Sequence, residues 1–416
     1  MIQEQIKILQ RLNRDALLQA AFACAGGWTC EFFGDPILSS TAVTLLIKFT
    51  DRLPMWAARI PLDQDYPFYD LYVQPLVYLE CYHPTIPAPR VHGYVDTNVD
   101  DNPVGVGYMF CDWIEGRPLP PWSLAGLPVL KRQRVLDQLA EHLLELFIGG
   151  VDPNPRDIRF YGVPEGTPDD MPISATEWLI ESIDRGIRRS LRRGNVSDAI
   201  DYLIQRALVP AYVVPEFDDT PWVVMHGNLR YDSILVDEDY NIRGIIGWHL
   251  TFAYPLQKAA TFPFLFENIP GSTPPAGGEE LKLIDRTPEK NYFLSIFAAK
   301  EMARTGQTRI SELIQTCYER AFFELSHHYH SIRAEFVKQP GFRTAENVAA
   351  AMEQLGQFLL VNQEFFGEEA ALLQIIRGLY DLEEDLLCSQ FDICLHQRPC
   401  MRGKKGPERG DLVYVH

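Results

Sequence analysis

The residues best suited to chemistry lie close together, between positions 223 and 249, among short apolar runs. His226 and His249 lie towards the two ends of this stretch, with Asn228 and Ser233 between them. A histidine can act as an acid or a base near neutral pH. An amide such as that of Asn228 can donate or accept a hydrogen bond and so polarise a carbonyl. These side chains are candidates for acid–base chemistry and for hydrogen bonding to a ligand.

The segment 223–248 resembles the catalytic core of the aminoglycoside/choline kinase family. The family pattern is roughly His-Gly-Asp-Leu-His-x-x-Asn-Ile-Leu-Val, then a turn, then Ile-Ile-Asp-Trp. This chain has His-Gly-Asn-Leu-Arg-Tyr-Asp-Ser-Ile-Leu-Val and later Ile-Ile-Gly-Trp. The resemblance implies that Asn228 stands at the position of the catalytic base. It also implies that Ser233 and Gly247 stand at the positions of the two metal ligands.

These three substitutions predict the loss of phosphoryl transfer. A neutral amide does not accept a proton at pH 7, and glycine offers no side-chain ligand to Mg²⁺. Losing a positioned general base costs roughly 10²–10⁴ in rate. The loss of both metal ligands leaves the phosphate charge without compensation. We therefore expect no metal ion and no other cofactor in the site.

Asp232 is the one neighbour that could rescue the kinase reaction. Adjacent residues on an extended segment point to opposite sides, so Asp232 would face away from the position of Ser233. The acidic run 237–239 is typical of a solvated turn between strands. An atypical phosphotransferase that uses Asp232 stays open as an alternative.

The resemblance extends over roughly residues 30–390. Arg59 occupies the position of the family's phosphate-contacting basic residue, and residues 85–89 and 108–119 resemble its linker and hinge. Residues 250–270 and 291–337 resemble a subgroup abundant in filamentous fungi. The resemblance implies a setting in fungal specialised metabolism. The scattered cysteines and an N-terminus without the apolar core of a signal peptide predict a cytoplasmic protein.

Two further departures weaken the prediction of nucleotide binding. The helical acid that should pair with Arg59 is replaced by Val73, with Gln74 beside it. Residues 34–40, expected as a phosphate-binding loop between the first two strands, hold one glycine, a proline and an acid. An acid there would repel phosphate.

The fold expected from the resemblance is α+β, the two-lobed protein-kinase-like fold. We predict a small N-lobe at 1–111 with an antiparallel sheet, and a larger, mostly helical C-lobe at 112–416 that contains the segment 223–248. The residue pattern predicts strands at 41–49 and 55–60, a helix at 69–82 and a turn at 239–241. Further helices are expected at 174–208, 291–337, 344–362 and 367–390. Another helix is indicated by an apolar stripe at Val135, Leu139, Leu143, Leu146 and Phe147.

Composition excludes several classes of partner. The 416 residues carry a net charge of −18, which disfavours nucleic acid and anionic membranes. No apolar run is long enough for a transmembrane helix. The eight cysteines are scattered, which favours reduced thiols over a zinc site. Glu324, His327 and His330 share a helix face, but apolar neighbours favour packing over metal binding.

The leading hypothesis is a kinase-fold protein that binds a small organic molecule in the interlobe cleft, where Ser233, Gly247 and Trp248 contact it. It could catalyse a metal- and ATP-independent cyclisation, isomerisation or dehydration through Asn228, His249, His226 or Asp232. For His226 a bracing role in the loop is favoured, whereas for His249 the two roles are balanced. A non-catalytic pseudokinase scaffold is the second hypothesis. The sequence leaves the ligand and the oligomeric state open.

Overall fold

The computed structural model describes residues 2–391 apart from 51–53, 65–68, 97–98, 100, 121–126, 150–173, 220–221, 267–285 and 368. The chain forms two compact units. The first consists of Met1–Ala175 with Val214–Tyr318, and the second of Thr176–Val213 with Glu319–His416. The lobe boundary predicted near residue 112 falls inside the first unit, at the end of a strand, and stays a prediction.

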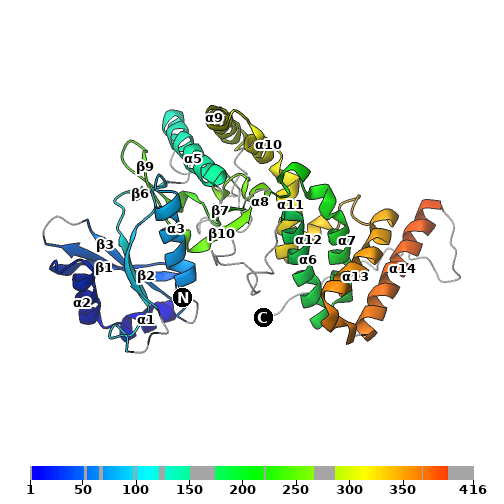
Figure 1. Cartoon of the computed structure of the whole chain (residues 1–416), viewed down its shortest axis with the longest axis horizontal. Helices are drawn as coiled ribbons and strands as arrows, with labels where there is room; N and C mark the ends of the chain where they lie inside the picture. The colour runs from blue at the N-terminus through cyan, green and yellow to red at the C-terminus, as the bar shows by residue number, and fades with distance from the viewer. Residues whose placement is uncertain are drawn as a thin grey trace, which may run out of the picture. The chain divides into compact units, whose positions relative to one another are not determined.

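A five-stranded antiparallel sheet occupies the N-terminal part of the first unit (Figure 1). Its strands lie in the order β1-β2-β3-β5-β4, which places β3 in the middle. The bounds are Cys30–Leu38 (β1), Ala42–Phe49 (β2), Trp56–Pro61 (β3), Val91–Val95 (β4) and Tyr108–Asp112 (β5). The strands predicted at 41–49 and 55–60 are confirmed as β2 and β3, each to within one residue.

The prediction of a loop at residues 34–40 is wrong, because strand β1 extends to Leu38 and so includes most of this segment. Pairing with β2 continues across an irregularity between Phe33 and Ile37. Gly34, at φ 71°, supplies the left-handed residue that a bulge of this kind often needs. Pro36 has no N–H to donate. It is tolerated because β1 is an edge strand, where one side of the backbone has no partner strand.

The two faces of the sheet have different environments. On one face, alternate residues such as Leu45, Ile47 and Phe110 form a buried cluster with α1 (Ile2–Arg11) and α2 (Arg14–Cys24). Successive side chains of a strand point to opposite faces. The intervening residues of β2, β3 and β5 therefore point to the other face, and several of them line a cavity.

The helix predicted at 69–82 is confirmed, but it has two parts. It starts with a π-helical turn, η1 (Tyr69–Val73), and continues as α3 (Gln74–Tyr82). A π turn contains one residue more than an α turn. The side chain of Tyr72, within this turn, lies beside Arg59 of the sheet.

Two small sheets frame the segment resembling a kinase core. One has the order β6-β8-β9 and the other pairs β10 with β7. The bounds are Arg117–Pro118 (β6), Trp222–His226 (β7), Ile234–Val236 (β8), Ile242–Ile245 (β9) and Thr251–Pro255 (β10). The predicted turn between β8 and β9 is confirmed: the Asp237 carboxylate accepts from the N–H groups of Asp239 at 3.0 Å and Asn241 at 2.9 Å.

Helices complete the first unit. The stripe predicted around Val135 and Phe147 is buried on α5 (Val129–Gly149). Helix α5 packs against α9 (Thr287–Thr305), where the rings of Phe147 and Phe297 lie 6.2 Å apart. The shorter elements are η4 (Pro215–Phe217), η5 (Tyr231–Ser233), η6 (Trp248–Leu250), α8 (Leu256–Ala259), η7 (Phe264–Phe266) and α10 (Arg309–Gln315).

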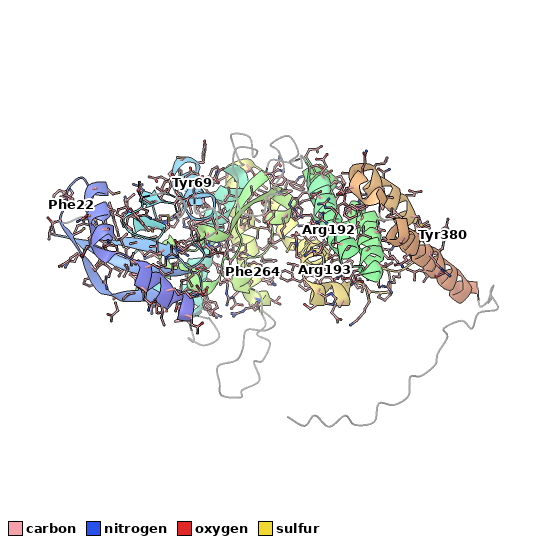
Figure 2. All side chains as sticks on the ribbon, turned by 90° about the horizontal axis from the view of Figure 1, so that it is seen from below. Phe22, Tyr69, Arg192, Arg193, Phe264 and Tyr380 are labelled. Carbon is pink, nitrogen blue, oxygen red and sulfur yellow. The ribbon has the colours of Figure 1, made fainter. Side chains whose placement is uncertain are left out.

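The second unit is helical. Its elements are α6 (Ala175–Arg192), α7 (Val196–Tyr212), α11 (Cys317–His328), α12 (His330–Phe336), α13 (Ala345–Val361), η8 (Gln363–Gly367) and α14 (Glu369–Phe391). A buried ion pair joins Arg206 and Asp184 at 2.9 Å, and Tyr212 stacks on Phe323 at 4.0 Å. Arg192 and Arg193 lie at the C-terminal end of α6, where the helix dipole favours positive charge (Figure 2).

The predicted N-terminal antiparallel sheet and the mostly helical remainder are confirmed. The helices expected at 174–208, 344–362 and 367–390 are present, and the region 291–337 holds four helices, α9 to α12. None of the described helices is both long and apolar enough to cross a bilayer.

Candidate functional site

A cavity of about 430 Å³ lies within the first unit, between the free face of the sheet and the loop that carries Ser233. The sheet contributes side chains of β2, β3 and β5, and the opposite wall comes from residues of η5, β8 and η6. Most of the remaining lining is apolar. It includes Leu76, Pro89, Met109, Ile114, Leu235 and Ile246.

Strand register places one charged residue in the floor of this cavity. Thr44 of β2, Arg59 of β3 and Met109 of β5 are direct neighbours across three strands, and all three line the cavity. Because β3 is the middle strand, its backbone is held on both sides. Arg59 is thus presented from the most constrained part of the sheet.

The neighbours of Arg59 are neutral. Its Nη2 donates to Nδ1 of His249 at 3.3 Å and to the Thr41 hydroxyl at 3.5 Å. Its guanidinium carbon lies 5.5 Å from the centre of the Tyr72 ring, within cation–π range. Among the described residues no carboxylate forms an ion pair with it, and its Nε is buried without a hydrogen-bond partner. Burial lowers the pKa of Arg59, yet a guanidinium remains charged at neutral pH.

Tyr72 was missed as a partner of Arg59. Counting back from Ile86 and Pro87 gives Val73, with Gln74 beside it, as the residue that should pair with Arg59, whereas the structure places the Tyr72 ring beside the guanidinium. Tyr72 is only 8% exposed and lines the cavity. A phenol is uncharged at neutral pH, and burial raises the pKa of Tyr72 further, so it supplies no counter-charge to Arg59.

His249 is brought against Arg59 and Tyr72 by the turn η6. Its ring stacks on Tyr72, with centroids 5.6 Å apart and an interplanar angle of 13°. Burial first, and then the charge of Arg59, lower the pKa of His249 to about 3. The imidazole is therefore neutral. Because Arg59 can only donate, Nδ1 is the acceptor and the proton of His249 sits on Nε2.

His226 is held from both sides by the backbone. Its Nε2–H donates to the Ile246 carbonyl at 2.9 Å, and its Nδ1 accepts from the Asn228 N–H at 3.3 Å. The side chain is 4% exposed, its ring meets Trp248 edge-on, and burial lowers its pKa to about 4. This geometry favours a bracing role in the loop.

The remaining predicted residues lie around His226. The Ser233 hydroxyl donates to the Asn228 carbonyl at 3.3 Å, which closes the loop between them. Gly247 adopts a left-handed conformation, with φ 89° and ψ 22°. Trp248 is buried and donates from Nε1 to the Ile245 carbonyl at 2.7 Å. Ser233, Gly247 and Trp248 all line the cavity, whereas Asn228 is not among its lining residues.

Asp232 lies in a 3₁₀ turn and not on an extended segment, so the premise used to orient it was wrong. It does line the cavity, but its side chain is 59% exposed and its Oδ1 is 3.8 Å from Nε of Arg230. The other carboxylate of the lining is Asp112. It accepts from Nε2 of His92 at 2.7 Å and from the Arg90 N–H at 3.2 Å, and the His92 contact lowers the pKa of Asp112.

The residues around His226 do not fit Mg²⁺. The three positions offer an amide, a hydroxyl directed to a backbone carbonyl, and no side chain. Magnesium in nucleotide sites is bound through one or two carboxylates together with phosphates and water. Within the described ranges no group of three or more His, Cys, Asp or Glu side chains is placed to hold a metal ion.

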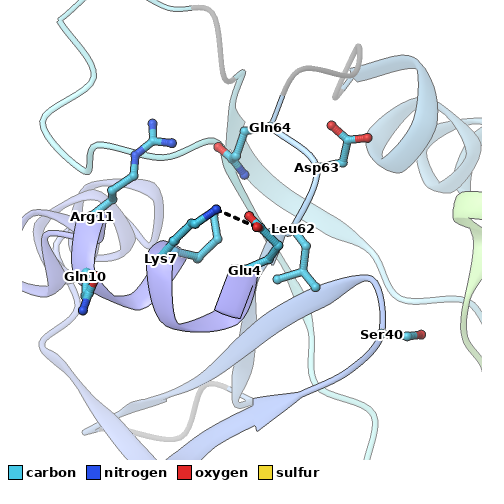
Figure 3. A pocket seen from close by; sticks show the side chains of 9 residues that line it. Glu4, Lys7, Gln10, Arg11, Ser40, Leu62, Asp63 and Gln64 are labelled. Atoms are coloured by element: carbon cyan, nitrogen blue, oxygen red, sulfur yellow. Dashed lines mark hydrogen bonds and ion pairs between the residues drawn. The ribbon is translucent and has the colours of Figure 1, made fainter. Parts of the chain in front are cut away.

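A second hollow lies beside α1 and the end of β3 (Figure 3). It is wide open and lined by polar residues including Glu4, Lys7 and Gln64. Lys7 and Glu4 pair with each other at 2.7 Å on the exposed surface. Such pairs contribute little energy, and none of the predicted site residues lies here.

The sequence matches no known protein-family profile and no curated protein. Solved structures do resemble the chain. A candidate aminoglycoside phosphotransferase from Ralstonia eutropha has a TM-score of 0.50 at 13% identity, over 84% of this chain and 96% of that one. Ethanolamine kinase from Plasmodium vivax has a TM-score of 0.42 at 13% identity, over 79% and 82% of the two chains. Choline kinase from Cryptosporidium parvum has 0.41 at 17% identity, over 84% and 93%.

The likeness to the Ralstonia eutropha structure shows the fold. The chain has a kinase-like phosphotransferase fold, as predicted. At 13% identity this likeness does not extend to activity or substrate.

The low pKa of His226 predicts an acid-sensitive fold. The unfolded side chain takes up a proton below about pH 6.5, whereas the folded one does so only near pH 4. The stabilisation is therefore complete above pH 6.5 and is lost as the pH falls towards 4. Between pH 7.5 and 5, His226 should account for a loss of about 2 kcal/mol in the free energy of unfolding.

Urea unfolding of wild type and His226→Gln at both pH values measures this loss. The glutamine can keep a donor to the Ile246 carbonyl but does not titrate. We expect its stability to fall by about 2 kcal/mol less than that of wild type over this range. Equal losses in the two proteins would contradict the assignment.

Gly247→Ala should lower the free energy of unfolding by about 1–2 kcal/mol, because a Cβ disfavours the left-handed backbone. Space is not the obstacle, since the nearest atoms to such a Cβ would lie 3.6–3.7 Å away. Gly356→Ala, at an exposed position inside α13, is the matched control and should raise stability by about 0.5–1 kcal/mol. Equal effects of the two substitutions in urea melts would refute the backbone argument.

Proposed function

We propose that this chain binds a small organic molecule in its cavity and does not transfer phosphate from Mg-ATP. The observation that carries the proposal is the set of neutral groups at Asn228, Ser233 and Gly247, beside a cavity that is still open. The Ser233 hydroxyl donates to the backbone carbonyl of Asn228, whose backbone N–H in turn donates to His226. Gly247 has no side chain to offer, and its backbone adopts the left-handed conformation that favours glycine.

The charges around the cavity support this proposal. Phosphoryl transfer needs a metal ion against the phosphates and a carboxylate near the attacking hydroxyl. The two carboxylates of the described lining are paired with other side chains, Asp112 with His92 at 2.7 Å and Asp232 with Arg230 at 3.8 Å. The residue beside Arg59 is an uncharged Tyr72 rather than an acid.

The shape and lining of the cavity fit an organic ligand. A volume of about 430 Å³ is within the range of small-molecule sites, which are mostly apolar with a few placed polar groups. Here the apolar part comes from residues such as Leu76 and Ile246, and the polar part from Arg59 and His249.

Metal-free chemistry on a carbonyl is the reaction class that these groups favour. A neutral imidazole whose Nδ1 is occupied acts as a hydrogen-bond donor through Nε2, and Arg59 lies beside it. Donors aimed at a carbonyl oxygen stabilise the negative charge that develops in isomerisation, cyclisation or dehydration. With a pKa of about 3, His249 is a weak base at pH 7, which favours donation over proton abstraction.

The proposal predicts that Mg²⁺ will not strengthen nucleotide binding. Calorimetric titration with ATP, with and without Mg²⁺, should give no metal-dependent gain in affinity. Incubation with γ-labelled ATP should release no phosphate above the protein-free rate. Tight Mg-ATP binding with phosphate turnover would refute the proposal. If Asp232→Asn then abolished that turnover while Glu238→Gln, in the exposed β8–β9 turn, did not, the chain would be an atypical phosphotransferase.

A further inference from the structure

We infer that Arg59 and His249 together form a subsite for the carboxylate of an apolar organic acid. This inference rests on the proposed function, because it concerns the same cavity, and it adds the chemical class of the ligand. It assigns to His249 the role of a positioned donor next to a cation.

The first argument is the charge of Arg59. It projects from the middle strand into a mostly apolar cavity, and its described neighbours are a hydroxyl, a phenol ring and an imidazole. Moving a cation out of water is costly unless an anion or several acceptors meet it. The chain supplies no such anion in the part that the structure describes. A ligand carboxylate would therefore gain more at this point than a neutral group of the same shape.

The second argument is the supply of free donors. Both side-chain hydrogen bonds of Arg59 to described residues come from Nη2, while its Nε is buried without a partner. His249 uses Nδ1 to accept from Arg59, so its Nε2 proton is left without a partner among the described residues. A carboxylate has two oxygens and takes bonds from several donors at once. A guanidinium edge and an imidazole N–H match that requirement.

The third argument is the surrounding surface. Apolar side chains of Leu76, Met109 and Ile246 line the same cavity, so the rest of the ligand should be apolar. The protein as a whole carries a net charge of −18 and repels anions in general. A preference for an anion over its neutral counterpart would have to arise locally, from groups such as Arg59.

A pair of fluorescent probes with the same aromatic body tests the inference. One is 8-anilinonaphthalene-1-sulfonate, an anion, and the other is N-phenyl-1-naphthylamine, which lacks the sulfonate. We expect the wild-type protein to bind the anion at least about tenfold more tightly, since a charged hydrogen bond contributes at this level. Arg59→Met should bring the ratio close to one while binding of the neutral probe stays within about twofold. His249→Phe keeps the stacking on Tyr72 and should lose a smaller part of the preference.

Arg243→Met is the matched control, because Arg243 is an exposed arginine on β9 outside the cavity lining. It should leave the ratio unchanged. Equal binding of the two probes by wild type, or a preference that survives Arg59→Met, would overturn the inference. An equal loss in Arg243→Met would do the same.

Nucleotide arms separate this inference from the proposed function. Displacement of the anionic probe by ADP that is strengthened by Mg²⁺ would refute both, since a metal nucleotide would then occupy the cavity. Displacement by metal-free ADP as effective as by 2-naphthoate would overturn the organic-acid assignment alone. No displacement by ADP, with displacement by 2-naphthoate and not by 2-naphthamide, is the result we expect.

Discussion

The charge of Arg59, with which no described carboxylate forms an ion pair, is the constraint on which the rest of the site depends. The guanidinium is fixed by the register of the middle strand and meets Thr41, Tyr72 and His249. Burial first, and then the charge of Arg59, lower the pKa of His249 and keep the imidazole neutral. A neutral imidazole can accept the hydrogen bond that Arg59 donates. Among the residues that the structure describes, no group of three or more His, Cys, Asp or Glu side chains is placed to hold a metal ion. A cation next to a neutral donor favours direct binding of a ligand oxygen.

The loop around His226 is held together largely by hydrogen bonds that involve backbone atoms. His226 connects two segments through Ile246 and Asn228, Ser233 closes the loop, and Trp248 anchors the following turn. In each of these bonds one partner is a backbone atom. They therefore do not require an acidic side chain at position 228 or 247.

Much of the fold could be predicted from the sequence. Apolar and β-branched runs located β2 and β3, and the stripe from Val135 to Phe147 located α5, because periodicity follows directly from how these elements bury one face. The path of β1 through Gly34 and Pro36 could not be predicted, since turn-forming residues there serve a bulge on an edge strand. The contact of Arg59 with Tyr72 and His249 is tertiary. It depends on a π turn and on residues up to 190 positions apart, which no local pattern encodes. For Asp232 the assumed extended backbone was wrong, although its exposure agrees with a surface role.

The free energy of unfolding of Arg59→Met, measured without ligand, tests the central claim most directly. If the guanidinium has no acid partner, the apolar methionine of similar length removes an unpaired buried charge. The free energy of unfolding should then rise by about 1 kcal/mol or more. The same substitution at a satisfied ion pair leaves the partner charge unpaired and costs about 3–5 kcal/mol. Urea unfolding that gave a loss of this size would contradict the account, because it would reveal a protein anion that already balances Arg59.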